Sequence, residues 1–307
     1  MRKAWKKRLL TAALVLVGTG LALVLGAFLM VRGRPSWYVK PTFNPAEQAQ
    51  ASQNLENKLI ETRNWAAAAS AQERAEIRAN QTATSPSTRP AGPVAQPITV
   101  SFTQDELNAS LYKWLEFNKL KDKVERFVHD PVILLQDGRV ILAGEVKTSN
   151  MDSILSAHFA PKLNADGKLD VGFGRLFAGR LPMPDAAIAD YRDKLLVALA
   201  EKMPAWQQEA KLDEAGVTND SFIHATLGKL LQATLLHEPT DALIFLPLDD
   251  RRGIAARLTA IEVGEKKITV TVERIPPADR KRALESLSDP FVSASQTSAG
   301  QVVPVSR

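Results

Sequence analysis

The sequence predicts an α+β fold in which a curved antiparallel sheet packs on helices, preceded by an N-terminal transmembrane helix and a helical stalk. Residues 9–31 are 23 consecutive residues without a charge, enough to cross a hydrocarbon core of about 30 Å. Within residues 98–275, apolar runs flank Asp-Gly pairs at 137–138 and 166–167, the pattern of antiparallel hairpins. Two stretches with apolar residues at helical spacing, from Asp185 and over 221–236, follow these hairpins.

The charges around the uncharged run predict its orientation. Five basic residues precede it and two, Arg32 and Arg34, follow it. Because Lys and Arg resist translocation, we expect the N-terminus in the cytoplasm and the rest of the chain outside. A cleaved signal peptide is the alternative, but its apolar core is usually about 7–15 residues long. Residues 1–34 are therefore predicted to form a single-pass membrane anchor, with an extracytoplasmic main domain.

The remaining composition excludes several function classes. Residues 1–40 hold eight Lys and Arg and no Asp or Glu, which leaves 31 basic and 34 acidic residues, a net charge of −3, beyond them. The basic pI thus belongs to the anchor, and we expect no nucleic-acid partner. The chain has no cysteine, which excludes disulfides, thiolate metal sites and cysteine nucleophiles.

Three segments flank the predicted domain at 98–275. Residues 35–81 contain no Pro or Gly after Pro45 and few apolar residues, which predicts a solvated helical stalk. The alternative is a helix that packs on the domain or on a second copy. Residues 82–97 include four prolines, which predicts a linker and a domain boundary. Residues 276–307 are Ser-rich and are expected to form a largely disordered tail.

The domain begins with a strand at 98–102, and a capping box formed by Thr103 and Glu106 starts the next helix. Hairpins are predicted at 132–146 and 154–178, the second with a bulge or bend after Gly174. Three strands at 242–247, 253–263 and 266–274 end the domain. Two long helices lie between the second hairpin and these strands. The periodicity predicts that the apolar side chains on one side of each helix face inward: Ile188, Tyr191, Leu195, Leu199 and Met203 in the first, and Ile223, Leu227, Leu230, Leu231 and Leu235 in the second.

Catalytic patterns are absent from the sequence. The four histidines show no spacing typical of a metal site, and no nucleophile elbow, phosphate loop or dinucleotide fingerprint occurs. We therefore expect no catalytic residue, no metal and no cofactor. An envelope hydrolase ranks third among the functions considered.

The apolar content of the first hairpin is more informative. Residues 132–135 and 140–142 are apolar on both faces, which indicates that something covers each side. A filled core explains this pattern, and so does an apolar groove that accepts an acyl chain. In the second hairpin, we expect Phe159, Leu169, Val171 and Phe173 to line the face that either packs or binds.

The order of strand, capped helix (FTQDELNASLYKWL), Asp-Gly hairpin and long strand ending in DGKLDVGFGRLFAGRLPMP resembles the YpmS-type membrane-anchored bacterial proteins. More distantly, it is similar to tubular lipid-binding (TULIP-like) domains. The resemblance covers about residues 98–200. It implies a long curved sheet that wraps a helix and an apolar groove that accepts lipid. The long insertion at 201–240 and the stalk depart from the short members of the family.

These observations together predict a non-catalytic envelope protein that binds or hands over a lipid or another apolar ligand. The expected partners are a membrane lipid and an envelope protein. The alternative is a structural or scaffolding protein with a filled core and a protein-binding surface.

Overall fold

The computed structural model describes residues 30–288, apart from 32, 41, 43, 83–95, 118–127, 148–151, 214–215 and 248–251. The predicted transmembrane run lies outside the described residues except for Met30 and Val31, and so do most of the linker and the tail beyond residue 288. None of the helices in the described ranges combines the length and the apolar character needed to cross a membrane.

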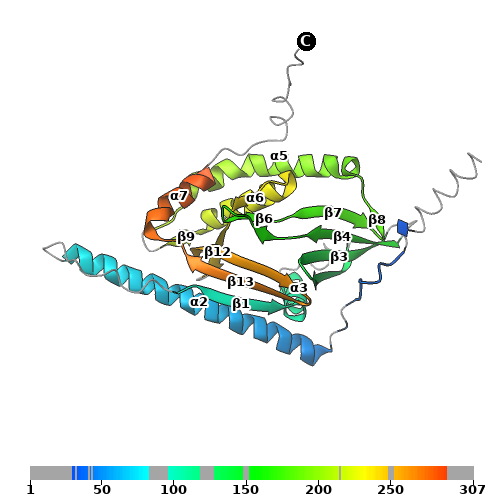
Figure 1. The fold of residues 1–307 in the computed structure, drawn as a ribbon, viewed down its shortest axis with the longest axis horizontal. Helices are drawn as coiled ribbons and strands as arrows, with labels where there is room; N and C mark the ends of the chain where they lie inside the picture. The colour runs from blue at the N-terminus through cyan, green and yellow to red at the C-terminus, as the bar shows by residue number, and fades with distance from the viewer. Residues whose placement is uncertain are drawn as a thin grey trace, which may run out of the picture.

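The described residues confirm an α+β fold with three antiparallel sheets (Figure 1). Sheet A has the order β1 (Ile98–Thr103), β13 (Lys267–Arg274), β12 (Arg252–Gly264) and β11 (Leu243–Pro247), and β9 (Val217–Asn219) also pairs with β12. Sheet B has the order β2 (His129–Gln136), β3 (Arg139–Lys147), β4 (Asp152–Phe159), β7 (Phe173–Ala178) and β8 (Leu181–Pro182). The small sheet C joins β10 (Thr240–Asp241), β6 (Lys168–Asp170) and β5 (Lys162–Leu163).

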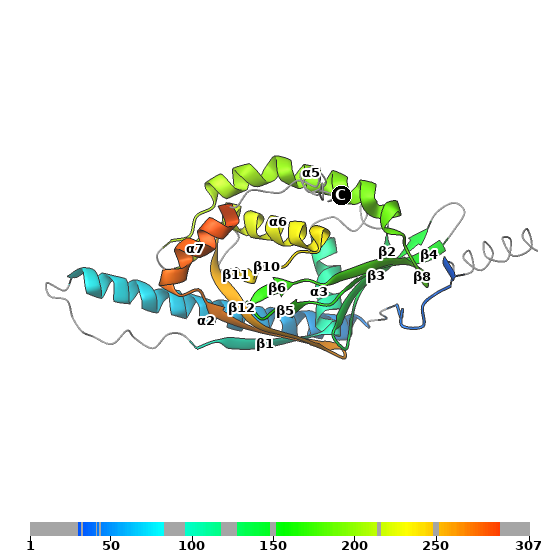
Figure 2. The same ribbon diagram turned by 45° about the horizontal axis from the view of Figure 1, so that its top comes forward.

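In the described ranges, five helices surround these sheets: α2 (Pro45–Thr82), α3 (Gln104–Phe117), α5 (Asp185–Glu209), α6 (Asp220–Leu236) and α7 (Pro277–Ser288). The long helix α2 runs along β1 and sheet A, while α5 and α6 lie on the opposite side of the molecule (Figures 1 and 2). Sheet B extends toward the end of the long axis where residues 33–40 lie (Figure 1).

The local sequence signals at the start of the domain are confirmed. The Thr103 Oγ1 accepts a hydrogen bond from the Glu106 amide at 3.2 Å, and the Glu106 carboxylate accepts one from the Thr103 amide at 2.8 Å. This capping box begins α3 as predicted. Gly138 has φ +70° in the turn between β2 and β3, where glycine avoids the strain of a left-handed backbone.

The second predicted hairpin is divided between two sheets. Strand β4 pairs with β7, whereas β5 pairs with β6 in sheet C. The backbone bends at Gly172, which has φ +59° and lies so close to Ala160 that a Cβ atom would meet the Ala160 backbone. A bulge or bend was also predicted after Gly174, and it is confirmed: the pairing of β4 with β7 shifts between Ala157 and Phe159, so that Gly174 and Arg175 together lie opposite His158.

The buried faces of α5 and α6 differ from the predicted ones. In α5, Leu199 and Met203 are buried as expected, but Tyr191 and Leu195 are exposed and Leu196 is buried instead. In α6 the buried set is Phe222, Ala225, Thr226, Gly228, Gln232 and Ala233, whereas Leu227 and Leu231 are exposed. Close helix packing contributes to this difference: a Cβ atom at Gly228 would meet the Met203 sulfur, so α6 approaches α5 at a glycine, while Phe222 is buried with Ala255 and Ile275.

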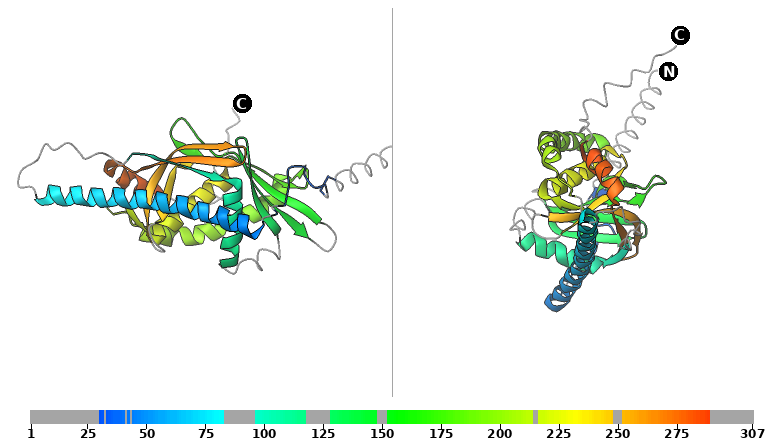
Figure 3. Two further views of the ribbon diagram at one scale, coloured as in Figure 1. Left: turned by 90° about the horizontal axis from the view of Figure 1, so that it is seen from below. Right: turned by 90° about the vertical axis from the view of Figure 1, so that its left-hand side faces the viewer.

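Two flanking segments also differ from the prediction. Helix α2 is not a solvated stalk but packs along the domain, with Leu55, Ala66 and Ala69 buried, as Figure 3 shows from two sides. The alternative of a helix that packs on the domain is therefore correct. The tail was expected to be disordered beyond Asp289, which lies outside the described residues. Before that point it contains α7, which was not predicted and whose Ala283 and Leu287 are buried in one cluster with Phe222, Ala255 and Ile275.

Candidate functional site

One face of sheet B is covered by residues 33–40, which we call the strap. Trp37 and Tyr38 of the strap pack on a cluster of buried strand residues: Val132, Leu134, Ile141, Ala143 and Ile154. Ion pairs join Arg34 to Glu145 and, at 2.7 Å, Lys40 to Asp130. The strap, which follows the predicted membrane span in the chain, is thus held tightly on sheet B.

Two titratable groups, one in the strap and one beneath it, are held in their neutral forms. Burial, together with the nearby charge of Asp130, raises the pKa of Tyr38 to about 12, and its hydroxyl donates to the Asp130 carbonyl at 3.2 Å. Burial and the charge of Arg139 lower the pKa of His158, whose ring lies between Trp37 and Phe177. Neutral groups avoid the cost of burying a charge, which suits a filled apolar layer.

The opposite face of sheet B, which we call the open face, is apolar but only partly covered. Side chains alternate along a strand, so residues that are paired in register share a face. The register therefore places these residues together on the open face: Val140, Leu142, Leu155, Ala157, Phe159, Phe173 and Leu176. Leu142, at the centre, is 45% exposed, whereas Ile141 beside it on the strap face is 1% exposed.

The four predicted site residues divide into two pairs. Phe159 and Phe173 are register partners at one end of the open face, with ring centroids 5.4 Å apart. Leu169 is buried in the core cluster that contains Ile254 and Ala256, and Val171 packs against that cluster. The bend at Gly172 separates the two pairs. Their role in ligand binding remains a prediction.

Helix α6 reaches the same end of the open face. Its C-cap residue His237 stacks on Phe173 with centroids 5.6 Å apart. Helix α5 starts at Asp185, three residues after β8 at the edge of sheet B. Both helices carry exposed apolar side chains, namely Tyr191, Leu195 and Val197 on α5 and Leu227 and Leu231 on α6. Sequence periodicity missed this exposure because it assigned most of these residues to the core.

A cavity of about 750 Å³ lies elsewhere, between the strap, the first turns of α2 and α3, and β2. Its lining mixes acidic, basic, amide and apolar side chains, including Lys40, Glu47, Asp105 and Lys266. None of the four predicted site residues lines it. The charges of both signs make this cavity less suited to an apolar ligand than the open face.

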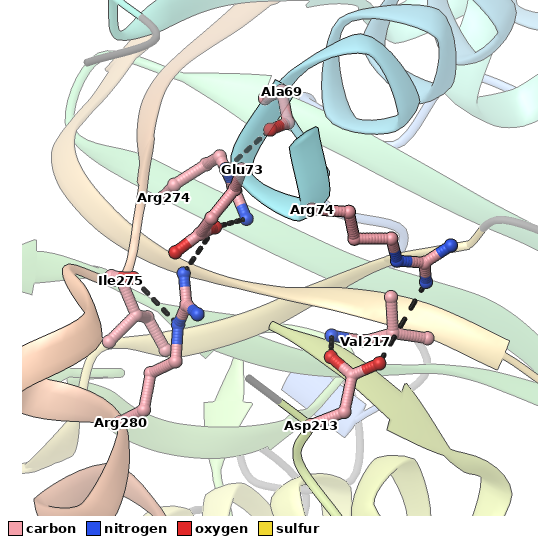
Figure 4. Close-up of polar contacts among 8 residues, drawn as sticks. All are labelled: Ala69, Glu73, Arg74, Asp213, Val217, Arg274, Ile275 and Arg280. Atoms are coloured by element: carbon pink, nitrogen blue, oxygen red, sulfur yellow. Dashed lines mark hydrogen bonds and ion pairs between the residues drawn. The ribbon is translucent and has the colours of Figure 1, made fainter. Parts of the chain in front are cut away.

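A buried ionic cluster fixes the other end of α2 (Figure 4). The Glu73 carboxylate of α2 accepts hydrogen bonds from Arg274 of β13 and, at 2.7 Å, from Arg280 of α7. Arg274 also donates to the Ala69 carbonyl at 2.7 Å, and Arg280 donates to the Ile275 carbonyl at 3.2 Å. Burial lowers the pKa of Arg274, an effect that the Glu73 charge opposes. These contacts join three elements, so the cluster has a structural role.

The described residues contain no group of three or more His, Asp or Glu side chains placed to hold a metal ion. Comparisons of the chain with protein-family models, curated proteins and solved structures found no match.

Proposed function

We propose that this chain is a single-pass envelope protein whose extracytoplasmic domain binds or hands over a lipid or another apolar ligand on the open face of sheet B, without covalent chemistry. One observation carries the proposal. The strap fills one face of sheet B, while the equally apolar opposite face leaves Leu142 45% exposed at its centre.

The physical reason is the cost of apolar surface in water. Each Å² of apolar surface removed from water contributes about 25 cal/mol, so an acyl chain laid on this face gains stability in proportion to the area it covers. Contiguous apolar patches on soluble surfaces typically mark binding sites. Phe159 and Phe173 lie together at one end of the face, and an apolar end suits the methyl end of an acyl chain.

The membrane attachment forms part of the same proposal. The uncharged run at 9–31 and its basic N-terminal flank support a span whose exit is joined to sheet B by the strap. The curved sheet and groove implied by the family resemblance are consistent with one open and one filled face. A scaffolding role, in which the exposed apolar side chains bind another protein, is the alternative.

Photo-crosslinking in living cells separates these two functions. We would place p-benzoylphenylalanine at position 142 in the full chain and, as a matched control, at position 271, which is half-buried in the middle of β13 in sheet A. We expect adducts with the mass of a lipid at position 142 and none at 271. Protein adducts at 142 would favour scaffolding, and a position 142 that crosslinks to neither would contradict ligand binding on this face.

A further inference from the structure

The cavity of about 750 Å³ between the strap, α2, α3 and β2, which we call the polar cavity, has the size of a small-molecule site. Carboxamide side chains from three elements line it: Gln50 and Asn54 of α2, Gln104 and Asn108 of α3, and Gln136 of β2. The half-buried Trp37 borders it on the strap side. Lipid binding on the open face uses none of these side chains.

Hydrogen bonds hold the walls of the polar cavity in place. The Asn108 side chain donates to the Ile133 carbonyl at 2.8 Å and accepts from the Ile133 amide at 2.7 Å. The Gln104 Oε1 atom accepts from the Leu135 amide at 2.9 Å. In the turn between β12 and β13, the Lys266 amide donates to the Leu135 carbonyl at 3.0 Å, and the Lys266 carbonyl accepts from the Gln104 amide at 2.9 Å. These bonds join α3, β2 and the turn into one preformed wall.

The backbone of Lys266 is strained at this wall. Lys266 has φ +57°, a left-handed conformation that is costly for a residue with a side chain. Such strain persists only where the surrounding structure fixes it, and it is frequent at ligand sites. Both backbone groups of Lys266 are hydrogen-bonded across the wall, so its conformation is fixed where the wall borders the polar cavity.

Other polar groups that line the polar cavity are left for a ligand. Within the described residues, five of the lining side chains make no hydrogen bond or ion pair with the protein: Gln50, Asn54, Asp105, Gln136 and Glu265. Glu106 differs from them, because it is buried and both of its oxygens bind the Lys58 ammonium at 2.7 Å. The cavity thus combines satisfied groups that build its walls with carboxamides and carboxylates that remain open to a ligand.

The strand edge at the polar cavity is not available to a peptide. A peptide that adds a strand to a sheet needs free N–H and C=O groups on the edge strand. On β2 these groups are already bonded, at Ile133 by Asn108 and at Leu135 by Gln104 and Lys266. Recognition in the cavity therefore depends on side chains, and not on main-chain pairing with β2.

The charges that line the polar cavity disfavour an anionic ligand. Lys40 is paired with Asp130 at 2.7 Å, which leaves Lys266 among the lining lysines. Besides the paired Glu106, three carboxylates line the cavity: Glu47, Asp105 and Glu265. Because like charges repel, a phosphate or a nucleotide is a poor occupant.

Hydroxyl groups match the groups that remain. A hydroxyl both donates and accepts, and a carboxamide presents a donor and an acceptor side by side, so one carboxamide can bind two neighbouring hydroxyl groups. A carboxylate accepts strong, charge-assisted bonds from hydroxyl groups. An indole ring offers apolar surface of the kind that contacts the C–H groups of a sugar ring.

We propose that the polar cavity binds a neutral saccharide, whose hydroxyl groups are held by the carboxamides of Gln50, Asn54 and Gln136 and whose ring contacts Trp37. None of the residues that form the open face lines this cavity. The two sites are therefore separate, and saccharide binding does not depend on the proposed lipid binding.

Saturation-transfer difference NMR on the full chain, in a detergent without a sugar head group, measures this binding. The probes are three neutral trisaccharides at millimolar concentration: maltotriose, cellotriose and triacetylchitotriose. We expect transfer of saturation to the ring protons of at least one of them. Binding of none of the three would overturn the proposal. Inorganic phosphate at the same concentration should not displace the bound trisaccharide, and displacement would overturn the assignment of a neutral ligand.

Two variants and a matched control test the location of the site. Gln50→Leu and Gln136→Leu each replace a lining carboxamide with a side chain of similar size that cannot form hydrogen bonds. Each should weaken saccharide binding about tenfold, because a sugar hydroxyl loses its partner in the complex. Gln53→Leu is the control, because Gln53 is also exposed on α2 but does not line the cavity, and its affinity should be unchanged.

Equal affinities in the two variants and the control would overturn the site. Circular dichroism checks that each variant is folded, which matters most for Gln136 because it lies in β2. If Gln136→Leu is unfolded, the comparison of Gln50→Leu with Gln53→Leu decides the question.

Discussion

Replacing Glu73 with alanine tests whether α2 is part of the folded domain. The Glu73 side chain is 13% exposed, and those of its partners Arg274 and Arg280 are 10% and 9% exposed. Glu73→Ala removes the carboxylate shared by two buried guanidinium groups. Because breaking a buried ion pair leaves its charge uncompensated, we expect a loss of about 3–5 kcal/mol in the free energy of unfolding.

A matched control lies on the same helix. Glu56 pairs with Lys113, but their side chains are 53% and 58% exposed. Water screens such a pair, so Glu56→Ala should cost only about 0–1 kcal/mol. Both changes remove one carboxylate from α2, so they differ mainly in the burial of the partner charges.

Urea unfolding of the full chain in detergent micelles, followed by circular dichroism, measures both variants. The expected result is a large fall in the urea midpoint for Glu73→Ala and a small one for Glu56→Ala. Equal small shifts would mean that α2 contributes little to the stability of the domain, and the stalk interpretation would return.

Four further predictions address the hairpin, the cap, pH and topology. Gly138→Val should lower stability by about 1–3 kcal/mol, because valine is strained at φ +70°; an unchanged melting temperature would argue against the turn. Thr103→Ala should cost about 0.5–2 kcal/mol through loss of the α3 cap, measured by urea unfolding. The lowered pKa of His158 means that the unfolded state binds a proton at this imidazole more readily than the folded state does. The stability contributed by the neutral imidazole is therefore present above pH ~6.5 and is lost as pH falls through the folded-state pKa. His158→Gln should flatten that part of the stability–pH profile. A reporter that is active only outside the cytoplasm, fused after Arg307, should be active, and a stable but inactive fusion would reverse the topology.

Local signals in the sequence predicted the elements whose stability is decided locally. The Asp-Gly pair at 137–138 and the capping box at Thr103 each need only a few neighbouring residues, so their patterns are sufficient. The packing of α2 is different. Its contacts use small residues such as Ala66 and Ala69, which give a weak apolar stripe, and an ionic cluster whose partners are about 200 residues away in the chain. Sequence periodicity contains no information on the packing of such small residues or on ion pairs between distant parts of the chain.

The candidate site was predictable only in part for a related reason. Alternation correctly placed Phe159 and Phe173 on one face, where they are register partners next to the bulge in the pairing of β4 with β7. It extended the same face to Leu169 and Val171, because the bend at Gly172 depends on close contact with Ala160, which no local pattern encodes.

The two faces of sheet B show why an apolar pattern alone does not distinguish a core from a binding site. Strand β3 carries Ile141 and Leu142 side by side, and their hydrophobicity is nearly equal. What separates them is the strap, which comes from more than 90 residues earlier and covers the Ile141 face alone. Helices α5 and α6 reach the Leu142 face at its edge and at its far end, through β8 and through His237, and leave its centre accessible. A sheet that needed only a filled core would gain by covering both faces, since each buried CH₂ contributes about 0.8 kcal/mol. We therefore propose that an apolar occupant supplies the cover that the described residues leave off the Leu142 face.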